Sequence, residues 1–376
     1  MSKKKLLATL SVAALMTGLA ACSSSRSDTS STTGASSAAA AAGNMVGISM
    51  PTRSLQRWNT DGAHLEDLLK KAGYQTSLQY ADDKVEQQIT QVENLINQNA
   101  KVLVIAAIDG TALGPVLQKA AGKNIKVIAY DRLINGTANV DYYATFDNYQ
   151  VGKLQGDFIV KQTGVDQGKG PFNLEPFAGS PDDNNAKFFF AGAWDVVSPY
   201  VKSGKFVVQS KKAPATDDDW KSIGITGWKS ATAQSEMDNR LNSFYTGGKK
   251  VNVVMSPNDS LALGIEQSLE SKGYKPGADY PVITGQDCDK ANTKNILAAK
   301  QSMCVFKDTR TLGDQVAKMV DQIVKGSTVE VNDTKTYNNG VKVVPSFLLV
   351  PNVVTKDKVK EALVDSGYYT AADIGM

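Results

Sequence analysis

The chain has 376 residues, 42% hydrophobic and 21% charged, which excludes a collagen, a coiled coil or a largely disordered protein and allows two domains with separate cores. Its 41 Lys and Arg residues against 38 Asp and Glu residues give a formal net charge of only +3, too little for sequence-independent nucleic-acid binding. Three of these charges, Lys3–Lys5, lie in a segment that we expect to be removed. The mature chain is then near neutral, and we expect a neutral partner.

The first residues have the pattern of a bacterial lipoprotein signal. Lysines at 3–5 precede an apolar stretch at 6–16 that is too short to span a bilayer, and the sequence LAAC at 19–22 is a lipobox. We expect a signal peptide at 1–21 and a lipid on the sulfur of Cys22, which would hold the exported protein on the outer side of the cell membrane. A plain signal peptide or a short membrane helix is the alternative. Residues 22–44, rich in Ser, Thr and Ala, are predicted to be a flexible tether.

From Met45 onward, short β-branched runs alternate with stretches whose apolar residues recur at helical spacing. We expect strands at 46–49, 75–80, 102–107, 126–130, 143–146, 188–190, 205–209, 251–255, 282–284, 303–306 and 342–350. We expect helices at 61–71, 84–97, 110–121, 148–162, 231–245, 260–273, 292–300 and 310–324. This alternation predicts βαβ units with helices on both faces of parallel sheets. Because one sheet of some ten strands is unusual at this length, we predict an α/β protein with two doubly wound parallel-sheet lobes.

Polar pairs follow five of the predicted strands. They are Asp131-Arg132, Asp147-Asn148, Asn258-Asp259, Gln286-Asp287 and Lys307-Asp308. One such pair could simply cap the next helix. Ligands of open α/β sheets bind at the carboxyl ends of the strands, so five successive pairs predict a polar ligand site.

The sequence lacks the motifs of dinucleotide-binding proteins, P-loop proteins and α/β-hydrolases. The sequence holds no GxGxxG after its first strand, no P-loop and no GxSxG elbow. The single histidine, His64, is expected on a helix, at its surface or half-buried, and no cysteine cluster has metal-ligand spacing, so no metal site is predicted. Paired carboxylates at 182–183 and 217–219 are only weak support for a glycosidase. Once Cys22 is lipidated, Cys288 and Cys304 are left as a pair, which predicts a disulfide, with two buried thiols as the alternative.

The motifs at these strand ends resemble one family. They include RW at 57–58, KVIAYDRLI at 126–134, YATFDN at 143–148, GSPDDNNA at 179–186, SPNDSLALG at 256–264, TGQD at 284–287 and VFKDTR at 305–310. From about Val46 to the C-terminus, the chain is similar to the periplasmic pentose- and hexose-binding proteins of sugar ABC transporters, of periplasmic binding protein type I. Its xylose-binding and multiple-sugar-binding members are the most alike.

This resemblance implies a receptor that clamps a sugar between two lobes joined by a three-strand hinge and does no chemistry on it. The lobes would be 45–147 plus 308–346 and 148–307 plus 347–376. The matching positions for sugar hydroxyls are Arg57, Asp131, Arg132, Asp183, Asn185, Asn258, Asp287 and Lys307, and the rings that would sandwich the sugar are Trp58 and Trp228.

The resemblance also implies the partners, namely a monosaccharide, an ABC permease with its ATPase subunit and, through the lipid, a membrane. We expect a monomer without cofactor, metal or nucleic acid. The sugar is expected to be an aldose among xylose, glucose, galactose and arabinose, which one sequence does not rank. The alternatives are a sensor that presents its closed form to a membrane histidine kinase and a secreted glycoside-processing enzyme. A transcription regulator of the same fold would need a helix-turn-helix segment in place of the signal peptide.

Overall fold

The computed structural model describes residues 44–277 and 280–376, all within one compact unit. The expected signal peptide, Cys22 and nearly all of the expected tether lie outside these residues. In the part of the chain that is described, no helix has the length and apolar character needed to cross a membrane.

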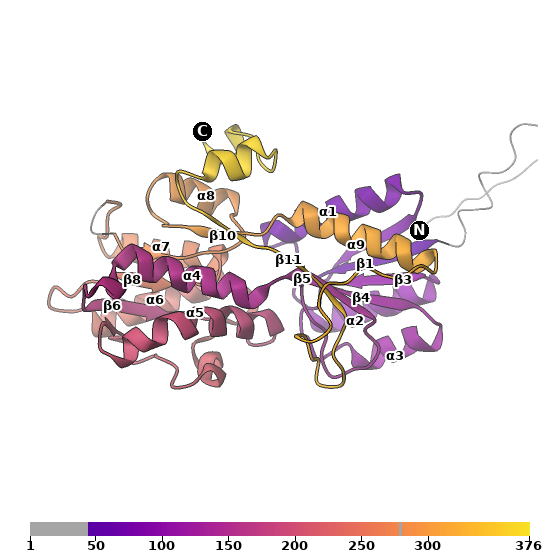
Figure 1. Ribbon diagram of the computed structural model, residues 1–376, viewed down its shortest axis with the longest axis horizontal. Coiled ribbons are helices and arrows are strands. Elements are labelled where there is room, and N and C mark those ends of the chain that lie inside the picture. Colours follow the sequence, from indigo (N-terminus) through magenta and orange to yellow (C-terminus); the bar gives the residue numbers. More distant parts are fainter. Residues whose placement is uncertain (1–43, 278–279) are drawn as a thin grey trace, which may run out of the picture. The chain divides into compact units, whose positions relative to one another are not determined.

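The first sheet has six parallel strands. In the order β11-β5-β4-β3-β1-β2 they are Ser346–Leu349, Tyr142–Phe146, Lys126–Tyr130, Val102–Ile105, Met45–Met50 and Gln75–Tyr80. The central strand β3, VLVI, is buried along its whole length, as expected for a parallel strand covered on both faces. Helices α1 (Gln56–Lys71) and α9 (Thr309–Val324) cover one face, and α2 (Val85–Asn97) and α3 (Gly114–Gly122) cover the other (Figure 1). We call this sheet with its four helices the first lobe.

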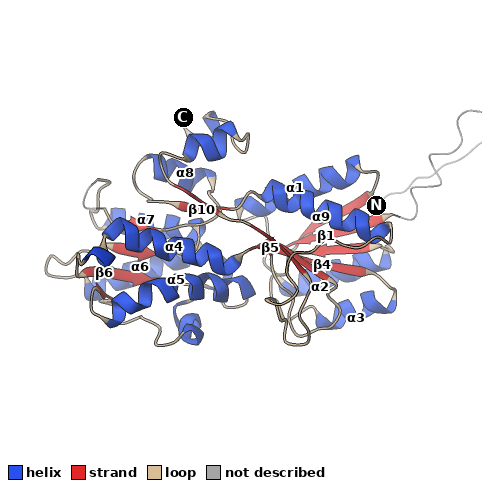
Figure 2. Cartoon of the chain, viewed as in Figure 1, coloured by secondary structure: helices blue, strands red, loops and turns tan. Residues whose placement is uncertain are grey.

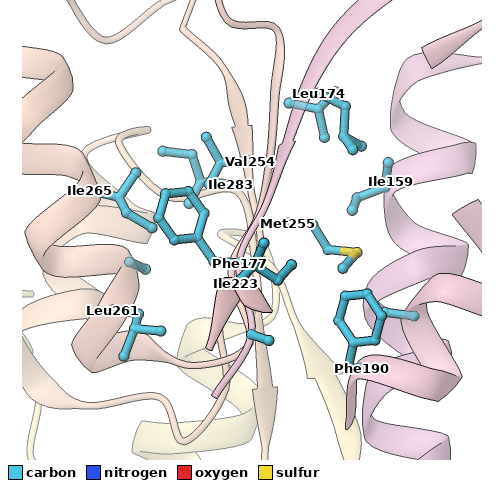
Figure 3. Close-up of a cluster of buried hydrophobic side chains, with 14 of the residues drawn as sticks. Ile159, Leu174, Phe177, Phe190, Ile223, Val254, Met255, Leu261, Ile265 and Ile283 are labelled. Carbon is cyan, nitrogen blue, oxygen red and sulfur yellow. The ribbon is translucent and has the colours of Figure 1, made fainter. Parts of the chain in front are cut away.

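The second lobe is built on a smaller parallel sheet. Its strands, in the order β7-β6-β8-β9, are Phe206–Val207, Phe172–Pro176, Val253–Met255 and Val282–Ile283. Its helices are α4 (Asn148–Thr163), α5 (Asn184–Lys202), α6 (Ser230–Phe244), α7 (Asp259–Ser271) and α8 (Lys290–Leu297). Figure 3 shows Ile159 and Phe190, from α4 and α5, on one side of the strands and Leu261 and Ile265, from α7, on the other. Val254 and Met255 are neighbours on β8 and point to opposite faces of the sheet, so each fills the core on one side of it.

Helices α4 and α5 cross at close range because glycines stand at the contact. A Cβ atom on Gly152 of α4 would overlap the backbone of Phe189, and one on Gly192 of α5 would overlap the backbone of Tyr149. The same helix pair carries site residues at the start of α5. Its position against α4 is therefore fixed by backbone-to-backbone packing.

Three segments cross between the lobes. They run from β5 to α4, from β10 (Cys304–Phe306) to α9, and from β11 to β12 (Asn352–Val354), and β10 and β12 pair as antiparallel strands at the crossing (Figure 2). The remaining C-terminal residues pack on α8 and β10 through a small apolar cluster. Short helical turns complete the chain: η2 (Val165–Gln167), η3 (Asp217–Ile223), η4 (Thr226–Trp228), η5 (Lys360–Asp365) and η6 (Ala372–Ile374). The predicted α/β fold with two doubly wound lobes and a three-strand hinge is confirmed.

One predicted strand is wrong. Residues 188–190, FFF, lie inside α5, which Asp183 caps by accepting a hydrogen bond from the backbone of Asn185 at 2.9 Å. Phe189 and Phe190 belong to an apolar stripe that continues through Ala193 and Val197 at helical spacing. Two strands were also not predicted, β6 and the short β12. The other predicted elements are present, with differences only at their ends.

Candidate functional site

All ten residues predicted to bind the ligand line one pocket between the two lobes. They are Arg57, Trp58, Asp131, Arg132, Asp183, Asn185, Trp228, Asn258, Asp287 and Lys307, joined by Leu55, Phe189 and Gln286. The pocket is narrow, with about 310 Å³ of space between its lining atoms when the open mouth is included.

Strand topology explains this convergence. In the first lobe, Arg57 and Trp58 lie in the first turn of α1, after β1, and Asp131 directly follows β4. In the second lobe, Asp183, Asn258 and Asp287 follow β6, β8 and β9, while Lys307 follows the crossing strand β10. Because parallel strands end at the same edge of their sheet, these side chains meet where the two sheets face each other.

The polar wall is an alternating network of three cations and three carboxylates. Arg57 Nη2 lies 3.0 Å from Asp131 Oδ2, and Arg57 Nη1 lies 3.6 Å from Asp287 Oδ1. Lys307 Nζ is 3.1 Å from the same Asp287 oxygen and 4.0 Å from Asp131 Oδ2. On the other side, Arg132 Nε lies 2.9 Å from Asp183 Oδ2. The charges that line the pocket balance, while a fourth carboxylate, Asp61, lies outside the lining with Oδ2 2.7 Å from Arg57 Nη2 and has a pKa raised by burial. The lining therefore suits a neutral ligand that offers both hydrogen-bond donors and acceptors.

Burial disfavours the charged form of each of these side chains. The charges of neighbouring side chains determine whether the pKa of each group still favours the charged form. For Asp131, desolvation alone would raise the pKa, but Arg57 and Lys307 outweigh it and lower the pKa below its ordinary value. For Arg57, desolvation would lower the pKa, and Asp131 and Asp61 reverse this and raise it. Desolvation raises the pKa of Asp183, although Arg132 acts against the rise. The Arg57–Asp131 pair is therefore the firmly charged centre of the site.

The two tryptophans are held in different ways. Trp58 is 1% exposed, the guanidinium carbon of Arg57 lies 4.3 Å from its ring centre, and its Nε1 is buried with no hydrogen-bond partner among the described residues. Trp228 donates from Nε1 to Asp183 Oδ2 at 3.2 Å, and its ring lies so close to Gly179 that a Cβ atom there would overlap it. Both indoles supply flat apolar surface beside charged groups.

Three pocket residues have left-handed backbone conformations, which residues other than glycine rarely adopt. The φ angles are 61° for Asp131, 55° for Trp228 and 91° for Asp287. Such conformations cost free energy and are concentrated at functional sites, where they direct a side chain that an ordinary backbone would point elsewhere. Their occurrence here agrees with a site that is organised in advance.

Asn185 uses its side chain within the protein. Its Oδ1 accepts from Tyr143 Oη at 2.9 Å and from Asn148 Nδ2 at 3.1 Å, while its Nδ2 donates to the backbone oxygen of Asp131 at 2.7 Å. Asn258 similarly uses Oδ1 to cap α7 at Leu261. Asn185 thus holds Asp131 in place, and its direct contact with the ligand stays a prediction.

Three pocket residues were absent from the predicted set. Gln286 was visible in the sequence as half of a strand-end pair, and its Oε1 is buried without a hydrogen-bond partner among the described residues. Phe189 was hidden by the wrong strand at 188–190, and no sequence signal marked Leu55. His64 lies outside the pocket, half-buried on α1 and 3.1 Å from Asp314 Oδ1.

The two cysteines lie beside the pocket. Cys288 and Cys304 form a disulfide that links the residue after Asp287 to the first residue of β10, three positions before Lys307. Within residues 44–277 and 280–376, no group of three or more His, Cys, Asp or Glu side chains is arranged to hold a metal ion.

Comparisons with known proteins give consistent matches. A family described as "Periplasmic binding protein domain" matches residues 46–328. The multiple sugar-binding periplasmic protein SbpA of Azospirillum brasilense is 52% identical, over 87% of this chain and 90% of that protein. The D-xylose-binding periplasmic protein of Escherichia coli is 35% identical, over 88% of this chain and 92% of that protein. A crystal structure of an ABC transporter solute binding protein from Clostridium phytofermentans with bound β-D-glucose has a TM-score of 0.84 and 50% identity, covering 88% of this chain and 100% of that one.

Proposed function

Since the chain belongs to the periplasmic binding protein family, we propose that it is the extracytoplasmic substrate-binding protein of a sugar ABC importer. Its ligand is an aldopentose or aldohexose monosaccharide of the xylose, glucose, galactose or arabinose type. Relatives named for sugar and xylose binding, and a similar structure that holds glucose, support this choice. The chain is a binding protein and not an enzyme, as the family and the relatives that it matches are binding proteins.

The observation that carries the proposal is the composition of the pocket, in which two indoles and six balancing charges from both lobes line one small space. A pyranose has a ring of hydroxyls, each both donor and acceptor, and apolar C–H faces above and below. Planar carboxylate and guanidinium groups engage neighbouring hydroxyls in pairs, and charge-assisted hydrogen bonds are about twice as strong as neutral ones. Trp58 and Trp228 give the C–H faces an apolar surface.

Binding works by closure. The expected boundary between 346 and 347 would cut β11, which belongs to the first sheet, so the lobes are 45–147 plus 308–349 and 148–307 plus 350–376. The two lobes move about the three crossing segments, and only the closed form brings both sets of side chains to the sugar. The ligand therefore stabilises the closed form by its differential affinity. The permease and its ATPase subunit receive this closed form.

The lipobox at 19–22 supports attachment to the membrane through Cys22, after removal of residues 1–21. Residues 22–44 would tether a monomeric sugar-binding body to the outer face of the membrane. A Cys22→Ala variant would then lose membrane association while keeping its sugar response. Persistence of the variant in the membrane fraction would contradict the anchor.

The proposed ligand is tested by a thermal-shift panel of aldopentoses, aldohexoses and disaccharides, followed by calorimetric titration of each hit. A sugar at about a hundred times its Kd adds about 2.7 kcal/mol of stability, which a melting curve resolves. We expect a rise in Tm with at least one monosaccharide, abolished by Asp131→Asn and by Trp228→Leu and retained by the control His64→Ala. No rise with any monosaccharide would contradict the proposed ligand class.

A further inference from the structure

The end of the second lobe opposite the sugar pocket is rich in lysine. In parallel strands the amino ends share one edge, and here the segments that lead into β6, β7, β8 and β9 all meet at that edge. Each of the four segments contributes two lysines. They are Lys161, Lys169, Lys202, Lys205, Lys249, Lys250, Lys272 and Lys275, which we call the lysine edge. It lies at the left end of Figure 1.

Contacts tie the four segments together. Lys205 Nζ donates to the backbone oxygen of Gly168 at 3.0 Å, and Asn173 Nδ2 donates to the backbone oxygen of Lys250 at 2.8 Å. Lys249, Lys250, Lys272 and Lys275 line one shallow hollow together with Tyr245 and Tyr274. Four of the lysines therefore share one surface, and the other four lie on segments that join the same edge of the sheet.

These cations have little neutralisation from the rest of the chain. Among residues 44–277 and 280–376, none of the eight lysines takes part in an ion pair, whereas first-lobe lysines such as Lys70, Lys71 and Lys119 do. Between these lysines and the strands that they precede, the sequence holds only two acidic residues, Asp166 and Asp279, and the nearby Glu270 of α7 is paired with Lys300 at 2.6 Å. All of the lysines are exposed except the half-buried Lys205.

Local roles explain only part of this cluster. Lys161 and Lys202 lie in the last turns of α4 and α5, where a cation is favoured by the helix dipole. Lys272 is the C-cap residue of α7 and is favoured in the same way. The remaining five precede strands, where neither a helix dipole nor a carboxylate accounts for them. In a chain whose mature charge is near zero, this concentration at one end is a marked asymmetry.

We propose that the lysine edge is a docking surface for a bilayer that contains anionic phospholipids. The hollow and its ring of lysines present a broad positive face, and lysines close to an anionic bilayer are attracted by its negative surface potential. The lipid anchor proposed above would place the body near such a surface. A fully extended tether of 23 residues reaches about 80 Å, so the tether alone does not select which end of the body meets the membrane. The charge of the lysine edge makes that selection while the protein is free of its permease, with the sugar pocket turned away from the lipid.

The test uses the mature chain with Cys22→Ser, so that no lipid contributes to binding. Co-sedimentation compares vesicles of phosphatidylcholine alone with vesicles in which about a third of the lipid is phosphatidylglycerol. We expect binding only to the anionic vesicles, with loss on raising the salt concentration. The variant Lys249→Gln/Lys250→Gln/Lys272→Gln/Lys275→Gln should lower the partition coefficient at least about tenfold.

The matched control is Lys70→Gln/Lys71→Gln/Lys119→Gln/Lys325→Gln, which changes the net charge equally at exposed, ion-paired lysines of the first lobe. It should retain most of the binding. Equal loss in both variants, binding to both kinds of vesicle, or no binding to the anionic vesicles would each overturn the proposal. Melting curves with and without sugar accompany each variant, so a failure of the proposed sugar binding is recorded separately from a failure of membrane docking.

Discussion

Arg132 and Asp183 join the two lobes inside the pocket, with Arg132 Nε 2.9 Å from Asp183 Oδ2. Arg132 follows β4 of the first sheet, and Asp183 precedes α5 of the second lobe. The same carboxylate oxygen accepts a hydrogen bond from Trp228 Nε1 at 3.2 Å. Asp183 thus couples contact between the lobes to the orientation of one of the two indoles.

We therefore predict that Asp183→Asn weakens sugar binding by about tenfold to a hundredfold, the usual cost of losing a hydrogen bond to a charged group. Asparagine is as good an N-cap as aspartate, so α5 should be retained. Calorimetric titration with the best sugar measures the effect. The control Asp182→Asn makes the same chemical change at the preceding residue, which does not line the pocket. Equal affinities of the two variants would contradict the role of Asp183.

A second link between the lobes lies outside the pocket. Gln56, at the start of α1, donates from Nε2 to Tyr369 Oη at 2.8 Å and accepts at Oε1 from the backbone N–H of Lys290 at 3.3 Å. Tyr369 in turn donates to the backbone oxygen of Cys288. This latch connects the first lobe to the C-terminal segment packed on α8.

Gln56→Ala should lower the apparent sugar affinity several-fold without removing any pocket side chain, because it reduces the population of the closed form. The loss should be seen as faster sugar release in stopped-flow fluorescence. Gln91→Ala is the control, since the Gln91 side chain bonds to the backbone oxygen of Tyr80 within the first lobe. If release from the two variants is equally fast, Gln56 does not act on closure.

Much of the site could be predicted from strand ends. Asp131 and Asp287 are far apart in the sequence, yet the topology of parallel sheets requires both to lie at a carboxyl edge, where the pocket is. The order of elements was predictable for the same reason, because β-branched runs such as 102–105 are typical of buried parallel strands.

What the sequence did not reveal depends on distant contacts. Strand β6, FNLEP, contains Asn, Glu and Pro, and it is stable because Glu175 is buried against Arg240, Ser210 and Tyr245 from elsewhere in the chain. The side-chain bonds of Asn185 are equally non-local. At 188–190, three aromatic residues have a high strand propensity. They are nevertheless helical, because Asp183 caps α5 and the apolar stripe of α5 packs into the core.

The disulfide permits a prediction for stability. Cys288 and Cys304 are 16 residues apart, and closing such a loop stabilises a protein by about 3 kcal/mol through the entropy of the unfolded chain. The double variant Cys288→Ala/Cys304→Ala should lose stability of this order in urea unfolding. The sugar affinity of this double variant should also fall, because Asp287 of the pocket directly precedes Cys288 in the chain. Intact mass spectra with and without reductant give the control, and two free thiols in the native protein would contradict the prediction.

Glu266 should make stability depend on pH. It lies on α7 and is 2% exposed, its Oε1 has no hydrogen-bond partner among the described residues, and burial raises its pKa to about 8. Because the pKa is higher in the folded state than in the unfolded state, folding is favoured when the group is protonated. This contribution is complete below the ordinary pKa of a glutamate and is lost as the pH rises through about 8.

Glu266→Gln should therefore be more stable than the natural protein at pH values above 8, with little difference in mildly acidic solution. Asn295 donates to Glu266 Oε2, and the amide oxygen of glutamine can accept the same bond. Urea unfolding at several pH values measures the change, with Glu270→Gln as the control on the same helix, where the carboxylate is exposed and paired with Lys300. A pH dependence of stability identical in the Glu266→Gln variant and the natural protein would show that this carboxyl is not the group that titrates.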